Sequence, residues 1–253
     1  MKLYTNWFSP FARKVALALD YKGLVYDAVD GLAHANNAEL KALNPRAEVP
    51  ALVDGDLVVV NSADILAYLD HRYPKEPIYP ADPAQRVAAR ALERLSDSRL
   101  DAILVDCSYW TWANRKDAPP KGLFEAGQRD IDKVLNQIEA AFGDSESTFL
   151  FGETPGVAEF ALWPQLTALR PLGFAIDQNR FRKTAALFGR LRRDDLFRAD
   201  TARTKAFLSS FTPETHEMTK IFWRGDRIEW MLARGFHDWF VNEIREDRVI
   251  WPD

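Results

Sequence analysis

Three short stretches near the start of the chain combine residues that could do chemistry with signals for the ends of secondary-structure elements. They are Ser9-Pro10, Val49-Pro50 and Asn61-Ser62. Ser9 is a good helix N-cap, and Pro10 suits the first helical position, where its missing N–H costs nothing. A hydroxyl at the positive end of a helix can also stabilise a neighbouring anion by donating a hydrogen bond. The pattern therefore predicts either a plain cap at Ser9 or an anion-stabilising hydroxyl.

The second stretch places a proline inside an apolar run that would otherwise be typical of a strand. Because proline cannot donate to a sheet ladder, Val49-Pro50 has two interpretations. One is an edge strand that starts at Ala51. The other is a cis peptide bond that turns the Val49 backbone outward to pair with an extended ligand. Asp54-Gly55 then predicts a hairpin turn into an antiparallel strand over residues 57–60.

Around these stretches the pattern alternates between strands and helices. A short strand over residues 2–6 leads into a helix that begins at Ser9 and ends at Gly23, which supplies the left-handed residue. A second strand is expected over residues 24–29. Ser62 is predicted to be the N-cap of the helix that follows the hairpin. The order is strand, helix, strand, helix, hairpin and helix.

This order, with a proline before the hairpin, resembles the thioredoxin-like domain of the glutathione transferase superfamily. The run Trp7-Phe8-Ser9-Pro10-Phe11 is most similar to the serine-type branches, which include the plant tau-like class and its bacterial cytosolic relatives. The resemblance implies an α/β thioredoxin-like N-terminal domain over residues 1–75. It also implies an all-α C-terminal domain over residues 83–253, where only the architecture is similar.

The rest of the chain is consistent with helices. A proline-rich linker over residues 73–80 marks the domain boundary, and a long helical stretch is expected from residue 83 to about 114. Gly156 and Glu159 predict a helix start in which glycine replaces the usual hydroxyl cap, at a cost of a few tenths of a kcal/mol. Cys107 is expected to be a small apolar core residue.

The resemblance implies that Ser9 is the catalytic residue and that glutathione is the co-substrate. A free thiol has a pKa of about 8.5 and is only a few per cent ionised at pH 7, so a hydroxyl that donates to sulfur raises the thiolate fraction. The implied glutathione-binding residues are Val49, Pro50, Asn61, Ser62, Glu48 and His34.

Two of these residues depart from the family pattern. Glu48 stands where similar proteins often have a basic or polar residue, and Asn61 stands where many have an acidic one. Both changes weaken charge complementarity with glutathione. Lys41, Arg46 or His34 could compensate, although a solvated surface explains those residues equally well.

The resemblance also implies an apolar cleft for a flat hydrophobic electrophile. The expected walls are Trp7, Phe8 and Phe11 on one side, with Tyr109 and Trp112 on the other. About half of these aromatic residues and their neighbours must be core, because a helix cannot turn Trp110 and Trp112 to the same face.

An aromatic C-terminal extension follows the point near Phe207 where transferases of this type usually finish. It contains Trp230, Phe236, Trp239, Phe240 and Trp251. The extension could pack on the helical domain, cover the cleft or extend a dimer contact.

Composition narrows the functional classes. The net charge of −4 gives no basic footprint for nucleic acid, and the four histidines lack metal-ligand spacing. No apolar run could span a membrane and no signal peptide is recognisable, so a cytoplasmic protein is expected. The resemblance implies a homodimer. The predicted function is a glutathione S-transferase without a metal, and the alternative is a catalytically silent binding or regulatory module, motivated by Glu48 and Asn61.

Overall fold

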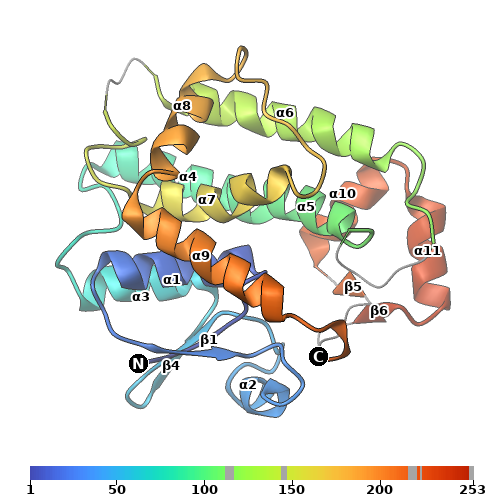
Figure 1. Ribbon diagram of the computed structural model, residues 1–253, viewed down its shortest axis with the longest axis horizontal. Helices are drawn as coiled ribbons and strands as arrows, with labels where there is room; N and C mark the ends of the chain where they lie inside the picture. The colour runs from blue at the N-terminus through green and yellow to red at the C-terminus, as the bar shows by residue number, and fades with distance from the viewer. Residues whose placement is uncertain (112–116, 144–146, 216–220, 223, 251–253) are drawn as a thin grey trace.

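The computed structural model describes residues 1–111, 117–143, 147–215, 221–222 and 224–250 of the 253-residue chain. A small α/β layer that contains the N-terminus lies against a larger layer of helices, and the last described residues lie along one side of that helical layer (Figure 1). The thioredoxin-like plus all-α architecture predicted from the sequence is confirmed. The boundary at residues 75–83 remains a prediction.

A four-stranded mixed sheet forms the centre of the α/β layer. The spatial order is β2-β1-β3-β4, with β1 parallel to β2 and antiparallel to β3. The third strand starts at Ala51, as expected, but it lies between two other strands, so the edge-strand interpretation is wrong. The Val49-Pro50 peptide bond is cis. The strands are β1 (Lys2–Thr5), β2 (Asp27–Asp30), β3 (Ala51–Asp54) and β4 (Leu57–Val60).

Three helices accompany this sheet: α1 (Pro10–Tyr21), α2 (Asn37–Leu43) and α3 (Ser62–Arg72). Ser9 caps α1, and Gly23 after its end is the left-handed residue that was predicted, with a φ of 65°.

The predicted cap of α3 is wrong by one residue. Asn61, not Ser62, is the N-cap, because its side-chain oxygen accepts the N–H of Ala63 at 3.0 Å. Asn61 has a φ of 70°, a backbone conformation that asparagine tolerates better than most residues. Ser62 is therefore the first residue of the helix.

The helical layer begins with one long rod that the sequence predicts over residues 83–114. In the structure the rod consists of α4, a π-helical turn (η1) and α5, and it ends at Ser108. Its elements and those that follow are α4 (Pro83–Leu95), η1 (Ser96–Leu100), α5 (Asp101–Ser108), α6 (Leu123–Ala141), α7 (Val157–Leu169), α8 (Arg182–Leu191), α9 (Asp195–Ser210) and the 3-10 turn η2 (Pro213–Thr215).

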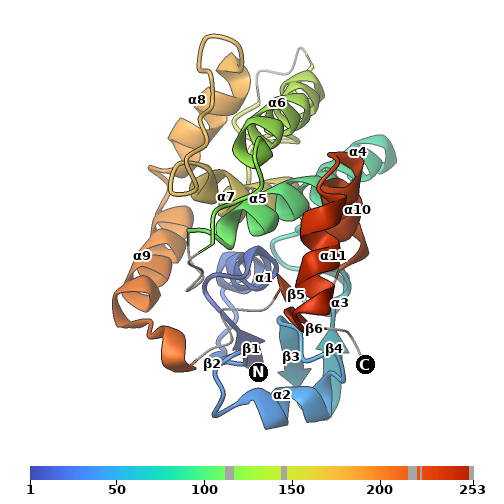
Figure 2. The same ribbon diagram turned by 90° about the vertical axis from the view of Figure 1, so that its right-hand side faces the viewer.

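The chain continues past α9 into a further helical unit. Its elements are β5 (Ile221–Phe222), α10 (Gly225–Ala233), α11 (His237–Arg245) and β6 (Val249–Ile250). Residues 224–250 are called the C-terminal segment below. Its first helix packs against α5 and its second helix packs against the first, on the side of the molecule that faces the viewer in Figure 2. Among the described residues, no helix has the length and apolar character needed to cross a lipid bilayer.

The main core joins both layers. α1 packs against α7 and α9, with fully buried Phe160, Trp163 and Phe197 in the helical layer. Cys107 is buried in this core, as predicted.

The start of α7 differs from the expectation that glycine merely lacks a capping hydroxyl. A side chain at Gly156 would bring its Cβ within 2.7 Å of the Ile78 carbonyl oxygen. The N–H of Val157 donates to that same oxygen at 3.0 Å. Glu159 supplies the remaining cap, since its carboxylate accepts the N–H of Gly156 at 3.0 Å. Glycine is therefore required here by the close approach of two backbones.

Candidate functional site

One end of the sheet collects the segments that the sequence singled out. β1 and β2 are parallel and end side by side, with Thr5 opposite Asp30. β3 runs the other way, so its first residue, Ala51, lies beside Tyr4 near the end of β1. Ala51 also pairs with Val60, the last residue of β4. Four loop segments therefore meet at this end of the sheet. They are the three that follow β1, β2 and β4 and the one that precedes β3.

Every glutathione-site residue predicted from the sequence lies on one of these four segments. The sheet register brings the segments together although they are spread over more than fifty residues of sequence. The residues are Ser9, His34, Glu48, Val49, Pro50, Asn61 and Ser62.

Ser9 is held at the N-terminus of α1. Its hydroxyl oxygen accepts the N–H of Ala12 at 3.3 Å, and its own N–H donates to the Asn6 carbonyl at 2.9 Å. The side chain of Asn6 donates in turn to Asp30 at 3.0 Å, which ties this loop to β2. A hydroxyl that accepts through its oxygen keeps its proton to donate elsewhere. Ser9 can therefore cap the helix and still donate to an anion at the positive helix end.

Val49 presents an unused backbone. Its side chain packs with Tyr4 and Leu40, and buried Pro50 follows it through the cis bond. Among the described residues, neither the N–H nor the carbonyl of Val49 has a hydrogen-bond partner. Unpaired backbone groups at a sheet end can pair with an extended peptide.

Ser62 lies at the N-terminus of α3 with little exposure. In the part of the chain that the structure describes, its hydroxyl makes no hydrogen bond. The first N–H groups of a helix point outward without intrahelical partners, and the helix dipole adds positive potential. This helix start is suited to a carboxylate.

Glu48 does not stand alone at the site. Both of its carboxylate oxygens accept from Arg46, at 3.1 and 3.0 Å, in an exposed two-point ion pair. Arg46 therefore offsets the negative charge that the sequence places beside Val49. Arg46 is one of the residues from which compensation was expected.

His34 lies on the segment that follows β2, and its backbone N–H donates to the carbonyl of Thr215 at 3.1 Å. This bond ties the segment to η2, just past the end of α9. No described hydrogen bond involves the imidazole itself.

The aromatic residues of the first loop face α9. The guanidinium of Arg203 lies over the ring of Trp7, with its carbon 5.0 Å from the ring centre. Phe8 packs edge-on against Phe207 and Phe211, with ring centres 5.1 and 4.9 Å apart. This pair of contacts was not predicted, because α9 follows the first loop by nearly two hundred residues.

Phe11 faces a different partner. The guanidinium carbon of Arg224, from the C-terminal segment, lies 4.7 Å from its ring centre. The Lys14 amino group lies 6.0 Å from the same ring.

Tyr109 is buried by the C-terminal segment, in a cluster with Ile228, Phe240 and Val249. Trp112 lies outside the described residues. The structure thus separates the predicted aromatic walls into a group at α9 and a group beneath the C-terminal segment.

Two cations of α1, about one helical turn after Ser9, form ion pairs that the sequence did not predict. Arg13 donates twice to Asp200 of α9, at 3.1 and 2.6 Å. Lys14, with no exposed surface, donates to Glu93 at 3.0 Å and Asp97 at 2.5 Å. The sequence did contain a signal for these ion pairs, because Arg13 and Lys14 are adjacent charged residues in a helix whose neighbouring residues are apolar, and buried cations need partners.

Three aspartates lie along the η1–α5 part of the rod, Asp97, Asp101 and Asp106, and Lys14 contacts the first of them. Burial raises the pKa of Asp97 to about 6, and Lys14 only partly offsets this effect. Burial likewise raises the pKa of Asp106 well above its usual range, despite nearby Arg227. Burial alone would lower the pKa of Arg227, but the charge of Asp101 raises it. The rod therefore holds two aspartates whose pKa burial raises, Asp97 and Asp106, and one that forms an ion pair with Arg227, Asp101.

Comparison with known proteins identifies the family. Residues 3–77 match the family model for the glutathione S-transferase N-terminal domain, and residues 121–193 match that for the C-terminal domain. The maleylacetoacetate isomerase of Pseudomonas aeruginosa is 34% identical over 206 residues, which cover 74% of this chain and 90% of that protein. The chain belongs to the glutathione S-transferase superfamily.

Further relatives refine the branch. The maleylpyruvate isomerase of a Ralstonia species is 31% identical over 186 residues, covering 67% of this chain and 82% of the relative. A holo structure of maleylpyruvate isomerase, described as a bacterial glutathione S-transferase of the zeta class, superimposes with a TM-score of 0.66. It is 27% identical and covers 79% of this chain and 96% of its own. The superfamily prediction is confirmed, whereas the tau-like emphasis was too narrow.

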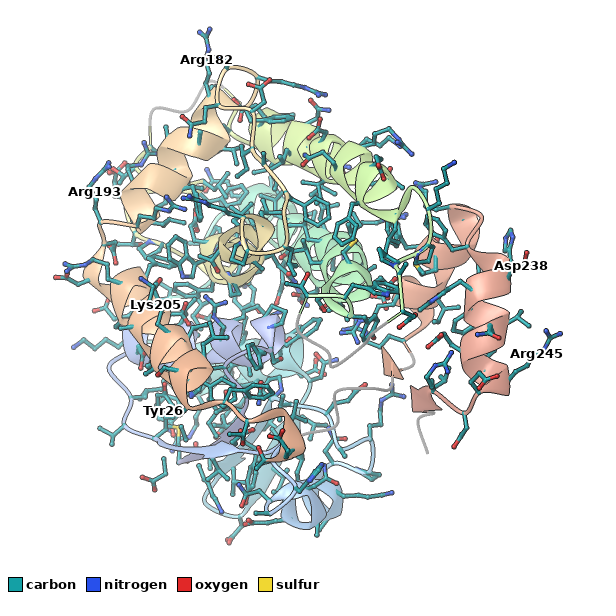
Figure 3. The ribbon with its side chains drawn as sticks, turned by 45° about the vertical axis from the view of Figure 1, so that its right-hand side comes forward. Tyr26, Arg182, Arg193, Lys205, Asp238 and Arg245 are labelled. Carbon is teal, nitrogen blue, oxygen red and sulfur yellow. The ribbon has the colours of Figure 1, made fainter. Side chains whose placement is uncertain are left out.

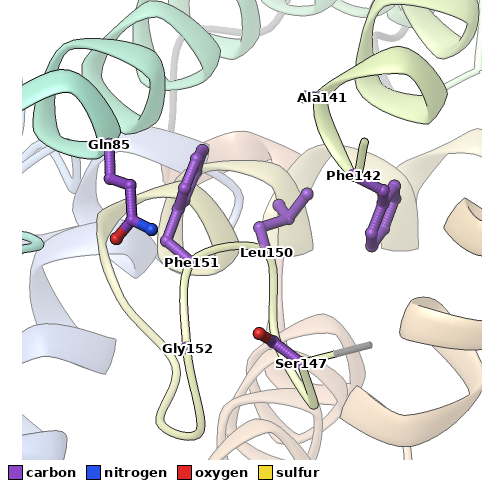
Figure 4. Close-up of a pocket in the computed structure, with 7 residues that line it drawn as sticks. All are labelled: Gln85, Ala141, Phe142, Ser147, Leu150, Phe151 and Gly152. Carbon is purple, nitrogen blue, oxygen red and sulfur yellow. The ribbon is translucent and has the colours of Figure 1, made fainter. Parts of the chain in front are cut away.

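The helical layer of this superfamily member also has an open recess (Figure 4). It measures about 450 Å³ and is lined by residues that include Gln85, Phe142 and Phe151. None of the residues predicted to bind glutathione or the electrophile lines it.

Proposed function

We propose that this chain binds glutathione at the end of the sheet where these four segments meet. Ser9 holds the cysteine sulfur of glutathione as a thiolate, and the thiolate attacks an electrophilic carbon. The observation that carries the proposal is the sheet register, which brings Ser9, Val49 and the start of α3 to the same end of the sheet. Those three positions supply a donor for sulfur, a backbone for the peptide and an anchor for a carboxylate.

The backbone of Val49 supports the binding pose. Its N–H and carbonyl pair with the cysteinyl backbone of glutathione as an added strand would. The γ-glutamyl carboxylate is bound by the hydroxyl of Ser62 and the first N–H groups of α3. Asn61 lies beside that carboxylate, and Arg46 offers its charge to the opposite end of the ligand.

Ser9 then acts on sulfur. Because its oxygen already accepts from Ala12, its proton is directed to another acceptor. A hydrogen bond to the charged form of a thiol lowers its pKa, and the positive end of α1 adds to the effect. The sulfur lone pair forms the new C–S bond, and the leaving group departs with the electrons of the bond that breaks.

A second candidate reaction is glutathione-dependent isomerisation, favoured by two relatives of 34% and 31% identity that are named isomerases. The same thiolate adds to an electron-poor C=C bond, the resulting single bond rotates, and expulsion of the thiolate restores the double bond and glutathione. Both reactions use Ser9 in the same role, so they differ only in the second substrate.

Calorimetric titration with glutathione tests the binding step. We expect saturable one-site binding to the wild type, with weaker binding to Ser62→Ala. Turnover of 1-chloro-2,4-dinitrobenzene or of maleylacetoacetate then separates the two reactions. Binding without any turnover would favour the silent binding module, and no binding would overturn the proposal.

We also propose a homodimer in the cytoplasm, as the family resemblance implies. The exposed apolar residues Leu57, Val58 and Val60 on edge strand β4 support a contact surface at that strand. Sedimentation equilibrium of the wild type and Val58→Glu would test the dimer.

A further inference from the structure

The C-terminal segment lies beyond the part of the chain that the family models match. The matched C-terminal domain ends at residue 193, whereas the segment comprises residues 224–250. Its helix α10 packs against α5 in the helical layer.

The segment contacts aromatic side chains of both α1 and the end of α5. On α1 it covers Phe11, two residues after Ser9, with the guanidinium of Arg224 at 4.7 Å from the ring centre. At the end of α5 it covers Tyr109 with Ile228 and Phe240. These are the positions where the sequence placed opposite walls for the second substrate.

A buried ion pair fixes this arrangement. Asp101, which has no exposed surface, accepts from Arg227 at 2.9 Å (Nε to Oδ2) and 3.3 Å (Nη2 to Oδ1). Arg224 lies 3.6 Å from the same carboxylate. Every cation paired with Asp101 among the described residues thus comes from the C-terminal segment.

The location of Asp101 makes this contact specific. The next three residues of α5, Ala102, Ile103 and Leu104, are core residues. A buried carboxylate at such a position is strongly unfavourable without a hydrogen-bonded partner. Docking of Arg227 satisfies that requirement, so one docked position of α10 is selected.

A second contact holds the same helix further along. Asp130 of α6 accepts from the Trp230 indole N–H at 3.0 Å and from Arg234. Burial would raise the pKa of Asp130, but these donors and Lys133 lower it to about 2. The segment is therefore docked on α5 and α6 through separate carboxylates.

We propose that the C-terminal segment is the outer wall of the second-substrate site, and that the Asp101–Arg227 ion pair determines the size of the electrophile by holding that wall in place. This inference rests on the proposed glutathione-dependent function, which locates the reacting sulfur beside Ser9. A docked wall over Phe11 and Tyr109 favours small electrophiles, and loosening it admits larger ones.

The test compares four proteins by their affinities for S-methylglutathione and S-octylglutathione, measured by calorimetry. They are the wild type, Arg227→Met, the double variant Asp101→Asn/Arg227→Met, and the control Arg245→Met. The double variant avoids an unpaired buried charge in case Arg227→Met alone fails to fold. Arg245 lies at the outer end of α11, away from the contact with α5 (Figure 3).

We expect the double variant to gain at least tenfold in affinity for the octyl ligand relative to the methyl ligand, while Arg245→Met keeps the wild-type ratio. If the ratio of octyl to methyl affinity in the double variant stays within twofold of the wild-type ratio, the proposal that the segment is the wall of the site is wrong.

If neither ligand binds the wild type, the proposed function is wrong. Binding of the apolar dye 8-anilinonaphthalene-1-sulfonate then tests separately whether the C-terminal segment covers Phe11 and Tyr109. Stronger dye fluorescence in the double variant than in the wild type and Arg245→Met supports it, because loosening exposes Phe11 and Tyr109. Equal fluorescence in all three proteins contradicts it.

Discussion

Arg13 of α1 and Asp200 of α9 form a buried two-point ion pair between the α/β layer and the helical layer. The Nε–Oδ1 distance is 3.1 Å and the Nη2–Oδ2 distance is 2.6 Å. The indole of Trp163 also donates to Asp200, at 2.9 Å. Because Ser9 lies one helical turn before Arg13, this pair fixes the helix that presents the proposed catalytic hydroxyl.

Replacing Asp200 with alanine should lower the free energy of unfolding by about 3–5 kcal/mol, since it leaves the Arg13 charge buried without a partner. Asp195→Ala is the control, because it breaks an exposed pair with Arg198 and should cost about 1 kcal/mol or less. Urea unfolding of both variants measures the difference. A loss at Asp200 no larger than that of the control would show that the buried pair does not fix α1.

Ser9→Ala should raise the pKa of bound glutathione and slow turnover at neutral pH, because it removes the donor that stabilises the charged sulfur. It also removes a helix cap, which costs about 1 kcal/mol of stability. Thiolate absorbance of the complex against pH measures the effect. Asp82→Ala controls for capping, since Asp82 caps α4 by accepting from Gln85 at 2.8 Å. Identical titration curves for wild type and Ser9→Ala would leave Ser9 as a cap alone.

Glu48→Gln should strengthen glutathione binding several-fold at low salt, an effect of about 1 kcal/mol. The substitution removes a negative charge and frees the Arg46 guanidinium from its two-point pair. Added salt should reduce the gain, because both groups are exposed. Calorimetry at two salt concentrations measures it, with Asp56→Asn as a matched loss of charge on the hairpin turn. An equal gain from Asp56→Asn would mean that only net charge matters.

The local signals in the sequence were sufficient for elements set by neighbouring residues. Ser9, Pro10 and Gly23 define α1 because caps and left-handed turns depend on residues within one helical turn. Asn61 was overlooked as a cap because either residue of Asn61-Ser62 could perform that role, and only the backbone conformation decides between them.

The contacts that complete the site depend on residues far apart in the chain. Asp200 lies 187 residues beyond Arg13, and Arg227 lies 126 residues beyond Asp101. No periodicity within a segment indicates such pairs. Likewise, the edge-strand interpretation of Val49-Pro50 remained open beside the cis interpretation, because the order β2-β1-β3-β4 arises from pairing between strands that are distant in sequence.

Asp97 predicts a pH dependence of stability. Its pKa is raised by burial to about 6 in the folded chain, above the value of about 3.9 expected when unfolded. The folded state therefore binds this proton more tightly, and the stability it contributes is present below about pH 4 and lost as the pH rises through 6.

Between pH 4 and 6 the wild type should lose unfolding free energy on the order of 2 kcal/mol through Asp97. Asp97→Asn should remove this loss, so that its unfolding free energy depends less on pH. Lys14 keeps its contact with Glu93 in this variant. Chemical unfolding at a series of pH values gives the two curves. Parallel curves for wild type and variant across this range would exclude Asp97 as the titrating group.

Gly156→Ser separates the capping argument from the packing argument at the start of α7. A serine hydroxyl should improve the cap by only a few tenths of a kcal/mol. Its Cβ would lie 2.7 Å from the Ile78 carbonyl oxygen, so two backbone segments must move apart. Such overpacking costs about 1–3 kcal/mol, which exceeds the capping gain.

We therefore expect Gly156→Ser to be less stable than the wild type by at least about 1 kcal/mol in urea unfolding. Gly189→Ala is the matched control, because it lies within α8, where the nearest atom to a new Cβ is 3.8 Å away on the flexible side chain of Arg193. That change should stabilise the protein by up to about 1 kcal/mol. A stabilising Gly156→Ser would mean that the segment before α4 yields easily at Ile78, and that the missing hydroxyl is the real defect of this helix start.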